Sequence, residues 1–224
     1  MRKRVPQRQA EGYILCKAYI LAKSIKAYIL AKSIKVGDSL DMEANKGEVI
    51  LLIGGARSGK SALAEKLVSE FKSVAYIATA EASDDEMKDR IRKHRKSRPV
   101  QWATYEVADR LDEALKEACS SSEAAVVDCL TMYVAKLMER TIDDNEVVSG
   151  VVRAVKEAKK TRKTVIFVSN EVGMGLVPDY PVGRRYRDLL GIVNQKVAAL
   201  ADKVFLIVAG IPVDIKELEF KMQN

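Results

Sequence analysis

A glycine-rich segment carries the strongest chemical signal in this chain. Residues 54–61 read GGARSGKS, which satisfies the pattern G-x-x-x-x-G-K-[ST] and lies between an apolar run and a helical pattern. Backbone N–H groups of such a loop wrap phosphates, its lysine neutralises the β and γ charges, and its last hydroxyl suits Mg²⁺. We therefore predict a nucleoside-triphosphate site made of Gly54, Gly55, Ala56, Arg57, Ser58, Gly59, Lys60 and Ser61.

An acidic residue at the end of a later apolar run is expected to complete a metal site. Asp128 follows residues 124–127, so its carboxylate should lie at the carboxyl edge of a sheet, where the second metal-side acid of such proteins sits. We assign Asp128, together with Ser61, to Mg²⁺, either directly or through water. An acidic loop residue without a ligand is the alternative.

The only histidine, His94, is the candidate nucleophile. An S-x-x-E capping box at residues 83–86 predicts a helix over residues 84–96, and Met87, Ile91 and His94 share one face of it. An imidazole beside phosphate-binding cations attacks phosphorus and holds a phosphoryl or nucleotidyl group, while the neighbouring positive charge keeps the imidazole neutral. A histidine that is partly covered on a basic helix is the alternative.

The elements that must position these residues alternate between short apolar runs and longer helical patterns. From Val49 onward this alternation predicts one α/β domain with a largely parallel sheet flanked by helices. Strands are predicted at residues 49–53, 74–78, 124–128, 164–169 and 204–208, and 102–105 is a further candidate. Helices are predicted at residues 60–71, 84–96, 108–118, 131–140, 145–160 and 183–201.

Composition narrows the class of protein. The 224 residues, 48% hydrophobic and 31% charged, suffice for one sizeable core. The 3 Cys form no C-x-x-C pair, which favours a reducing, cytoplasmic location and argues against disulfides or structural zinc. Of the 38 Lys and Arg and the 31 Asp and Glu, nine bases and three acids lie in residues 1–41, which therefore hold most of the net charge of +7. The remaining chain is nearly neutral, so nucleic-acid binding is not expected.

The basic N-terminal segment is expected to be an appendage. Residues 18–26 read AYILAKSIK, and residues 27–35 repeat them letter for letter. A nine-residue repeat turns successive helical copies by about 180°, so no continuous apolar stripe forms, and the recurring lysines argue against a membrane span. We predict a poorly ordered or helical extension over residues 1–46 and a core domain over residues 47–224. A weak amphipathic attachment to a membrane or a partner is the alternative.

Several further stretches of the core domain match one pattern. They are Y-I-A-T-A at residues 76–80, R-I-x-x-H-x-x-x-R-P at 90–99, D-C-L-T at 128–131 and N-E-V-G-M-G at 170–175. Together with residues 54–61 they resemble the bifunctional adenosylcobinamide kinase / adenosylcobinamide-phosphate guanylyltransferases of cobalamin assembly, from about Glu48 to the C-terminus. The family typically has Trp shortly after D-C-L-T, where this chain has Tyr133, a change that we expect to affect packing more than chemistry.

The resemblance implies a P-loop, RecA-like fold, a homo-trimer and two reactions. The first phosphorylates the aminopropanol hydroxyl of adenosylcobinamide with ATP or GTP in the presence of Mg²⁺. The second transfers GMP from GTP to adenosylcobinamide phosphate, with His94 as the guanylylated residue, and gives adenosylcobinamide-GDP. The resemblance also implies nucleotide contacts at Ala78, Thr79, Ala80, Arg95, Lys96, Ser97, Arg98, Glu106 and Asp128.

Two other functions are compatible with parts of the sequence. A small-molecule or nucleotide kinase would use residues 54–61 and Asp128 without any need of His94. A nucleotide-dependent switch or membrane-recruited binding protein would depend on residues 1–41. A covalent nucleotide adduct separates the bifunctional enzyme from the first alternative, and truncation separates it from the second.

A polar, glycine-containing segment after the predicted strand 164–169 is expected to face a ligand. It spans residues 169–180, and Glu171 is its candidate substrate contact, with a simple turn as the alternative. The next helix begins with three arginines that we expect to form a solvated basic face rather than to reach a phosphate across a subunit boundary. They are Arg184, Arg185 and Arg187.

Overall fold

Strands from along the chain form one sheet in a computed structural model that describes residues 47–80, 85, 88, 89, 92, 98–107, 109–140 and 143–218. The strand order is β3-β2-β4-β5-β1-β6-β7, and every neighbouring pair is parallel except the last, in which β7 runs antiparallel to β6. The strands are β1 (Val49–Gly54), β2 (Val74–Ala78), β3 (Ala103–Glu106), β4 (Ala124–Asp128), β5 (Thr164–Asn170), β6 (Lys203–Val208) and β7 (Ile211–Asp214).

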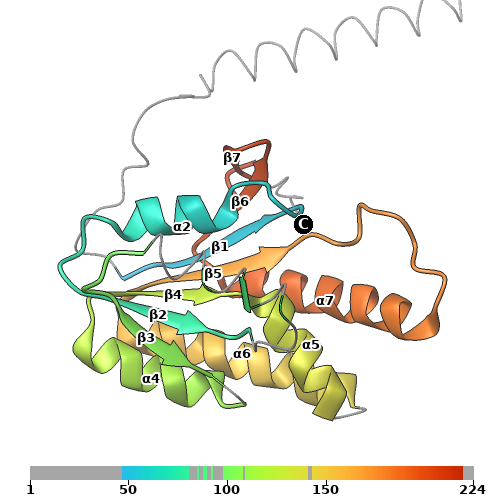
Figure 1. Cartoon of the computed structure of the whole chain (residues 1–224), viewed down its shortest axis with the longest axis horizontal. Helices are drawn as coiled ribbons and strands as arrows, with labels where there is room; N and C mark the ends of the chain where they lie inside the picture. The colour runs from blue at the N-terminus through green and yellow to red at the C-terminus, as the bar shows by residue number, and fades with distance from the viewer. Residues whose placement is uncertain are drawn as a thin grey trace, which may run out of the picture. The chain divides into compact units, whose positions relative to one another are not determined.

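Helices cover both faces of this sheet (Figure 1). Helix α2 packs on one face against β1, β4 and β5, while the other described helices lie on the opposite face. The described helices are α2 (Lys60–Val68), α4 (Leu111–Ser121), α5 (Leu130–Arg140), α6 (Asp144–Thr161) and α7 (Pro181–Leu200). The prediction of a helix-flanked, largely parallel sheet of P-loop type is confirmed.

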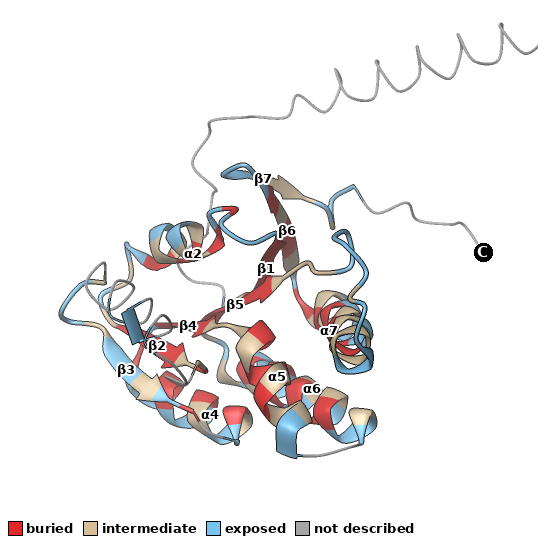
Figure 2. Cartoon of the chain, turned by 45° about the vertical axis from the view of Figure 1, so that its right-hand side comes forward, coloured by how far each residue is buried: buried red, intermediate tan, exposed pale blue. Residues whose placement is uncertain are grey.

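Burial on both faces explains why the central strands are continuous apolar runs. Every residue of β1 is buried or nearly so, and β4 and β5 are buried along almost their whole length (Figure 2). Alternate residues serve two cores, since Leu51 and Phe167 pack toward α4, α6 and α7 while Ile50 and Leu52 pack toward α2. A strand that packs against a core on each face has no polar face, so its sequence shows no alternation of apolar and polar residues.

The predicted strands agree with the observed ones to within one residue at each end, whereas three helices, α2, α4 and α7, differ by two or three residues at one end or both. Helix α2 ends at Val68 instead of residue 71, because the Ser69 hydroxyl and backbone N–H both turn back to the Lys66 carbonyl. Helix α4 begins at Leu111 instead of residue 108. Most of the predicted helix over residues 84–96 lies outside the described residues, and Asp85, Lys88, Asp89 and Arg92, which are described, are helical.

One strand was missing from the sequence prediction. Strand β7 follows β6 through a tight turn in which Ala209 and Gly210 both have positive φ, as a two-residue hairpin requires. The strand is only four residues long and contains Pro212, which is tolerated because β7 is the edge of the sheet. A short run containing proline does not stand out as a strand in sequence.

The predicted N-terminal extension, residues 1–46, lies outside the described residues. Within the part of the chain that the structure describes, no helix combines the length and apolarity needed to cross a membrane.

Candidate active site

The glycine-rich segment forms a loop between the end of β1 and the start of α2. Gly59 precedes the helix with φ of 101°, a left-handed conformation that favours glycine, and no side chain caps the first turn. The loop is braced from within by a Ser58 N–H to Gly55 carbonyl bond and from outside by the Gly210 N–H, which donates to the Ser58 carbonyl at 2.9 Å. Gly59 has no side chain that could cap the first turn of α2, and the N–H groups at such a helix N-terminus favour an anion such as phosphate.

The Lys60 ammonium lies inside the curve of this loop. Its Nζ donates to the carbonyl oxygens of Gly54 at 3.0 Å and Gly55 at 2.6 Å, and it lies 3.4 Å from the Ser58 hydroxyl. The Lys60 side chain is buried, with only 7% of its residue surface exposed. A buried cation at the helix N-terminus gives the loop a concentrated positive charge that matches a triphosphate.

The next residue of the loop meets the predicted acidic partner. The Ser61 hydroxyl donates to Asp128 Oδ2 at 3.1 Å, although β5 lies between β1, which precedes Ser61, and β4, which ends at Asp128. Helix α2 makes this contact because it crosses the sheet from β1 over β5 toward β4. The structure therefore brings together the two residues that the sequence assigned to one metal ion.

This hydroxyl and carboxylate suit Mg²⁺ in kind and number. Among the described residues, no group of three or more His, Cys, Asp or Glu side chains could hold a metal ion by itself. Mg²⁺ in nucleotide sites is commonly held by one or two protein oxygens together with substrate phosphates and water. The Ser61 and Asp128 pair, beside a phosphate loop, fits that mode of binding.

Asp128 also accepts a second hydrogen bond, from the hydroxyl of Tyr76 on β2. The phenol oxygen of Tyr76 donates to Asp128 Oδ2 at 2.5 Å, and Tyr76 is only 2% exposed. Burial, together with the negative charge of Asp128, raises the pKa of Tyr76 far above its usual range. The phenol therefore stays protonated and donates to the carboxylate.

The Tyr76 ring carries a cation on its face. The Cζ atom of Arg98 lies 3.2 Å from the centre of the ring, within the range of a cation–π contact. Arg98 Nε is buried and makes no hydrogen bond to the described residues. Arg98 is one of the predicted nucleotide contacts. It contacts the Tyr76 ring, and the Tyr76 hydroxyl in turn bonds to Asp128.

Thr79, another predicted nucleotide contact, lies next to the C-terminal end of β4. Its hydroxyl accepts from the Cys129 N–H at 2.8 Å and donates to the Cys129 carbonyl at 2.7 Å, and its own N–H donates to the Asp128 carbonyl. Thr79 is completely buried. The Thr79 side chain thus fixes the backbone immediately after Asp128.

Strand register gathers other predicted site residues at the same sheet edge. Ala78 pairs with Asp128 on one side and with Glu106 on the other, so all three end parallel strands at one level. Ala78 and Ala80 are half-buried, while Glu106 is exposed and two strands away from Asp128. The remaining predicted site residues lie outside the described residues; they are His94, Arg95, Lys96 and Ser97.

A hydrogen-bonded network that the sequence analysis did not foresee ties β5 to α5 and α7. Asn170 N–H donates to the Thr131 hydroxyl at 2.9 Å, the Ser169 hydroxyl donates to Asn194 Oδ1 at 2.7 Å, and Asn194 Nδ2 donates back to the Asn170 carbonyl at 3.0 Å. The Glu171 N–H then donates to the Gly54 carbonyl at 3.0 Å. The only signal in the sequence was that Thr131 falls in the D-C-L-T stretch and Asn170 and Glu171 fall in the N-E-V-G-M-G stretch; Ser169 and Asn194 lie outside both stretches.

The chain turns after β5, and the Glu171 side chain closes this turn, since its Oε1 accepts the Gly173 N–H at 2.6 Å. The three arginines at the start of α7 bond within the chain: Arg184 to the Pro178 carbonyl, Arg185 to Asp144 and Arg187 to Asp188. Each of these arginines is half-buried.

Two side chains near the site serve packing rather than chemistry. Burial, followed by the charge of Asp128, raises the pKa of Cys129 to about 11, so its thiol is neutral and weakly nucleophilic at neutral pH. Tyr133 is 1% exposed, donates to the Asp109 carbonyl at 2.5 Å and accepts the Leu111 N–H. It anchors the start of α4, in agreement with the packing role expected for it.

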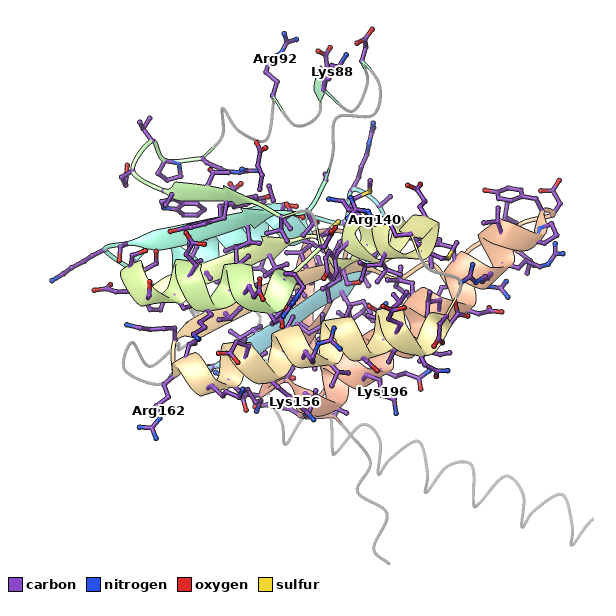
Figure 3. All side chains as sticks on the ribbon, turned by 90° about the horizontal axis from the view of Figure 1, so that it is seen from below. Lys88, Arg92, Arg140, Lys156, Arg162 and Lys196 are labelled. Atoms are coloured by element: carbon purple, nitrogen blue, oxygen red, sulfur yellow. The ribbon has the colours of Figure 1, made fainter. Side chains whose placement is uncertain are left out.

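Figure 3 labels six basic side chains outside the loop. Lys88 and Arg92 extend from one short segment, whereas Arg140 lies on α5, Lys156 on α6, Arg162 directly after α6 and Lys196 on α7.

Comparison with known proteins identifies the family. The model of the family "Cobinamide kinase / cobinamide phosphate guanyltransferase" matches residues 50–215. The bifunctional adenosylcobalamin biosynthesis protein CobU of Salmonella typhimurium is 39% identical over 185 residues, covering 75% of this chain and 99% of the relative. CobU of Escherichia coli is 39% identical over 180 residues, with 75% and 99% covered. CobP of Pseudomonas aeruginosa, described as the same bifunctional protein, is 40% identical over 168 residues, with 74% and 96% covered.

A KaiC-like protein from Pyrococcus horikoshii is among the similar solved structures, with a TM-score of 0.44, 15% sequence identity and coverage of 72% of this chain and 71% of that one. The match of the family model over most of the core domain, and of relatives over nearly their whole length, decides the assignment. The chain belongs to the cobinamide kinase / cobinamide phosphate guanyltransferase family, the bifunctional enzymes of adenosylcobalamin biosynthesis.

Proposed function

We propose that this chain phosphorylates the aminopropanol hydroxyl of adenosylcobinamide and then converts the phosphate to adenosylcobinamide-GDP, using the nucleotide site at residues 54–61. The observation that carries the proposal is the Ser61 to Asp128 contact of 3.1 Å beside a loop that already holds the Lys60 ammonium. Family membership supports the pair of reactions over a kinase activity alone.

In the kinase reaction, the loop holds the triphosphate of ATP or GTP. The N–H groups at the start of α2 and the Lys60 ammonium bind the β- and γ-phosphates and offset the charge that develops on the transferring group. The substrate hydroxyl forms a bond to the γ-phosphorus while the bond to the β-γ bridging oxygen breaks. The nucleoside diphosphate leaves, and the hydroxyl proton is released.

Ser61 and Asp128 would hold Mg²⁺ at this site, because both supply hard oxygen atoms at the edge of the phosphate loop. When bound, Mg²⁺ spreads the negative charge of the phosphates and orients them. Thr79 supports this arrangement by fixing the backbone after Asp128.

In the guanylyltransferase reaction, His94 is the proposed nucleophile. Its neutral imidazole nitrogen forms a bond to the α-phosphorus of GTP while pyrophosphate leaves. A phosphate oxygen of adenosylcobinamide phosphate then attacks the same phosphorus, and the nitrogen–phosphorus bond breaks. Two displacements thus replace one difficult step. Arg95, Lys96, Ser97 and Arg98 are the proposed nucleotide contacts beside His94, and Ala78, Ala80 and Glu106 complete them.

We further propose a homo-trimer in the cytoplasm. Exposed apolar side chains between β5 and α7 and at the start of α7 support self-association, since large exposed apolar groups close together in sequence are typical of interaction sites. They are Met174, Leu176, Val177, Tyr180 and Val182. The free thiols of Cys119 and Cys129 suit a reducing compartment. Light scattering coupled to size-exclusion chromatography would measure the trimer directly.

Labelled GTP tests the proposed covalent step. Incubation with GTP labelled at the α-phosphate should leave an acid-labile, base-stable adduct on the protein, and GTP labelled at the γ-phosphate should leave none. Adenosylcobinamide phosphate should then remove the label as adenosylcobinamide-GDP.

The matched variants locate the adduct. His94→Ala should abolish labelling, whereas Arg92→Ala, a change at an exposed position of the same segment, should label like the unmodified chain. Absence of label on the unmodified chain would remove the guanylyl-histidine from the proposal and leave the kinase reaction.

A further inference from the structure

Tyr76 lies on the same face of the sheet as Asp128 and two residues before it in register. Tyr76 pairs with Val126, and Ala78 pairs with Asp128, so the side chains of Tyr76, Val126 and Asp128 project from one face. That face is the one covered by α2, which also carries Ser61. The sheet therefore directs the phenol toward the carboxylate at the edge of the nucleotide loop.

The hydrogen bonds of Tyr76 and Ser61 converge on a single oxygen of Asp128. Oδ2 accepts from the phenol at 2.5 Å and from the Ser61 hydroxyl at 3.1 Å. Two donors on one oxygen fix the rotation of the carboxylate about its terminal bond, which is otherwise a broad, weakly restricted torsion. The Ser61 donor belongs to the proposed metal site, but the Tyr76 donor does not.

The Tyr76 ring is itself fixed by the residues that surround it. Tyr76 is 2% exposed and belongs to the core between the sheet and α2, and the Arg98 guanidinium lies 3.2 Å from the ring centre. A buried ring with a cation on its face is restricted in both position and tilt. The phenol oxygen is consequently a fixed donor rather than a mobile one.

We infer that Tyr76 is a positioning residue, whose hydroxyl holds the Asp128 carboxylate in the orientation in which Asp128 and Ser61 serve Mg²⁺. This inference rests on the assignment of Mg²⁺ to Ser61 and Asp128 in the proposed function. Tyr76 acts through Asp128 and touches neither nucleotide nor corrinoid in this role. Outer partners that orient a ligating carboxylate typically change metal affinity by about 10- to 100-fold.

Tyr76→Phe in the full chain tests the inference, because it keeps the ring and the Arg98 contact and removes only the donor. We measure the Mg²⁺ concentration that gives half of the Mg²⁺-dependent gain in binding of a fluorescent GTP analogue. This concentration should rise about tenfold in Tyr76→Phe, while analogue binding without Mg²⁺ stays within about twofold. Kinase kcat at saturating Mg²⁺ should recover to near that of the unmodified chain.

Tyr105→Phe is the matched control, because it removes a tyrosine hydroxyl from another strand. Tyr105 lies on β3, and its exposed hydroxyl is 3.3 Å from the Ser121 hydroxyl at the end of α4. This substitution should leave the Mg²⁺ midpoint unchanged. A lower melting temperature of Tyr76→Phe with an unchanged midpoint would show a packing role and overturn the inference. An unmodified chain whose analogue binding ignores Mg²⁺ would contradict the magnesium assignment itself, and the inference with it.

Discussion

Lys60 is the residue on which the phosphate loop depends for its charge. Its ammonium is buried against the Gly54 and Gly55 carbonyls, and a bound triphosphate would offer it stronger, charged acceptors. Lys60→Ala should weaken GTP binding by at least about tenfold, since a charge-assisted hydrogen bond contributes about 1.5–3 kcal/mol. Isothermal titration calorimetry measures this change directly.

The matched control for this substitution lies on the same helix. Lys66 is exposed near the end of α2, so Lys66→Ala should leave GTP affinity as it is. If Lys60→Ala bound GTP as strongly as the unmodified chain, residues 54–61 would not be the phosphate site.

Individual site residues differed in how far the sequence could predict them. Residues 54–61 and Asp128 were predictable because a loop pattern and a strand end fix their geometry locally. Tyr76 was not, because its role depends on β2 lying next to β4, and strand order is a tertiary property. The same holds for Thr79, whose partner Cys129 lies fifty residues away in sequence.

At the level of the elements, Thr79 joins the ends of β2 and β4. Thr79→Val keeps the side-chain volume but removes the hydroxyl that bonds the Cys129 N–H and carbonyl. Because both backbone groups would lose a buried partner, the free energy of unfolding should fall by about 1–3 kcal/mol. Urea denaturation provides the measurement.

Thr104→Val makes the same chemical change on the exposed strand β3 and should alter the free energy of unfolding by less than about 0.5 kcal/mol. Equal losses in the two variants would mean that the Thr79 hydroxyl contributes nothing specific at the strand ends.

Asp202 joins three elements at the opposite edge of the sheet. Its Oδ2 accepts the Val49 N–H at 2.9 Å, its Oδ1 accepts Lys159 Nζ at 2.8 Å, and its own N–H donates to the Val49 carbonyl. Burial opposes ionisation, but the bonds from Lys159 and Val49 outweigh it and lower the pKa of Asp202. Asp202 therefore stabilises the fold above its ordinary pKa near 4, and that contribution is lost as the pH falls below it.

Asp202→Asn tests this pH dependence. At pH 7 the substitution should lower the free energy of unfolding by about 1 kcal/mol, a modest value because the ion pair is partly exposed. The difference should shrink as the pH falls from about 4 toward the lowered pKa of folded Asp202, where the unmodified carboxylate becomes protonated as well. Asp179→Asn, at an exposed position, should show neither effect. A difference that persisted undiminished at pH 3 would argue against an ionised Asp202 as its source.

The elements themselves were largely predictable because long apolar runs and helical periodicity are local properties. Strands β1, β2, β4 and β5 are buried along almost their whole length, so their boundaries coincide with the ends of apolar runs. Strand β7 was not predictable, because its pairing with β6 comes from a turn at Gly210 rather than from its own four residues.

At the scale of the whole molecule, the carboxyl edge of the sheet collects the site from distant parts of the chain. Parallel strands end at this edge with Gly54, Ala78, Glu106, Asp128 and Asn170. The family match begins at residue 50 and β1 begins at Val49, and we therefore expect the chemistry to belong to the predicted core domain, residues 47–224.

Truncation to a chain that begins at Met42 should therefore leave kinase and guanylyltransferase kcat/KM within about twofold, since a domain with its own core folds alone. Steady-state assays of both reactions on the truncated and full chains make the comparison. Loss of either activity on truncation would assign the N-terminal extension a role in function, as the nucleotide-dependent switch would require.

The central claim is that one nucleotide site serves a histidine nucleophile. A crystal structure with Mg²⁺ and a GTP analogue that cannot be cleaved between its α- and β-phosphates tests this claim most directly. We predict Lys60 Nζ bonded to phosphate, and an imidazole nitrogen of His94, from the same or a neighbouring subunit, within about 3–3.5 Å of the α-phosphorus. A triphosphate seated in residues 54–61 with every His94 ring far from the α-phosphorus would contradict it.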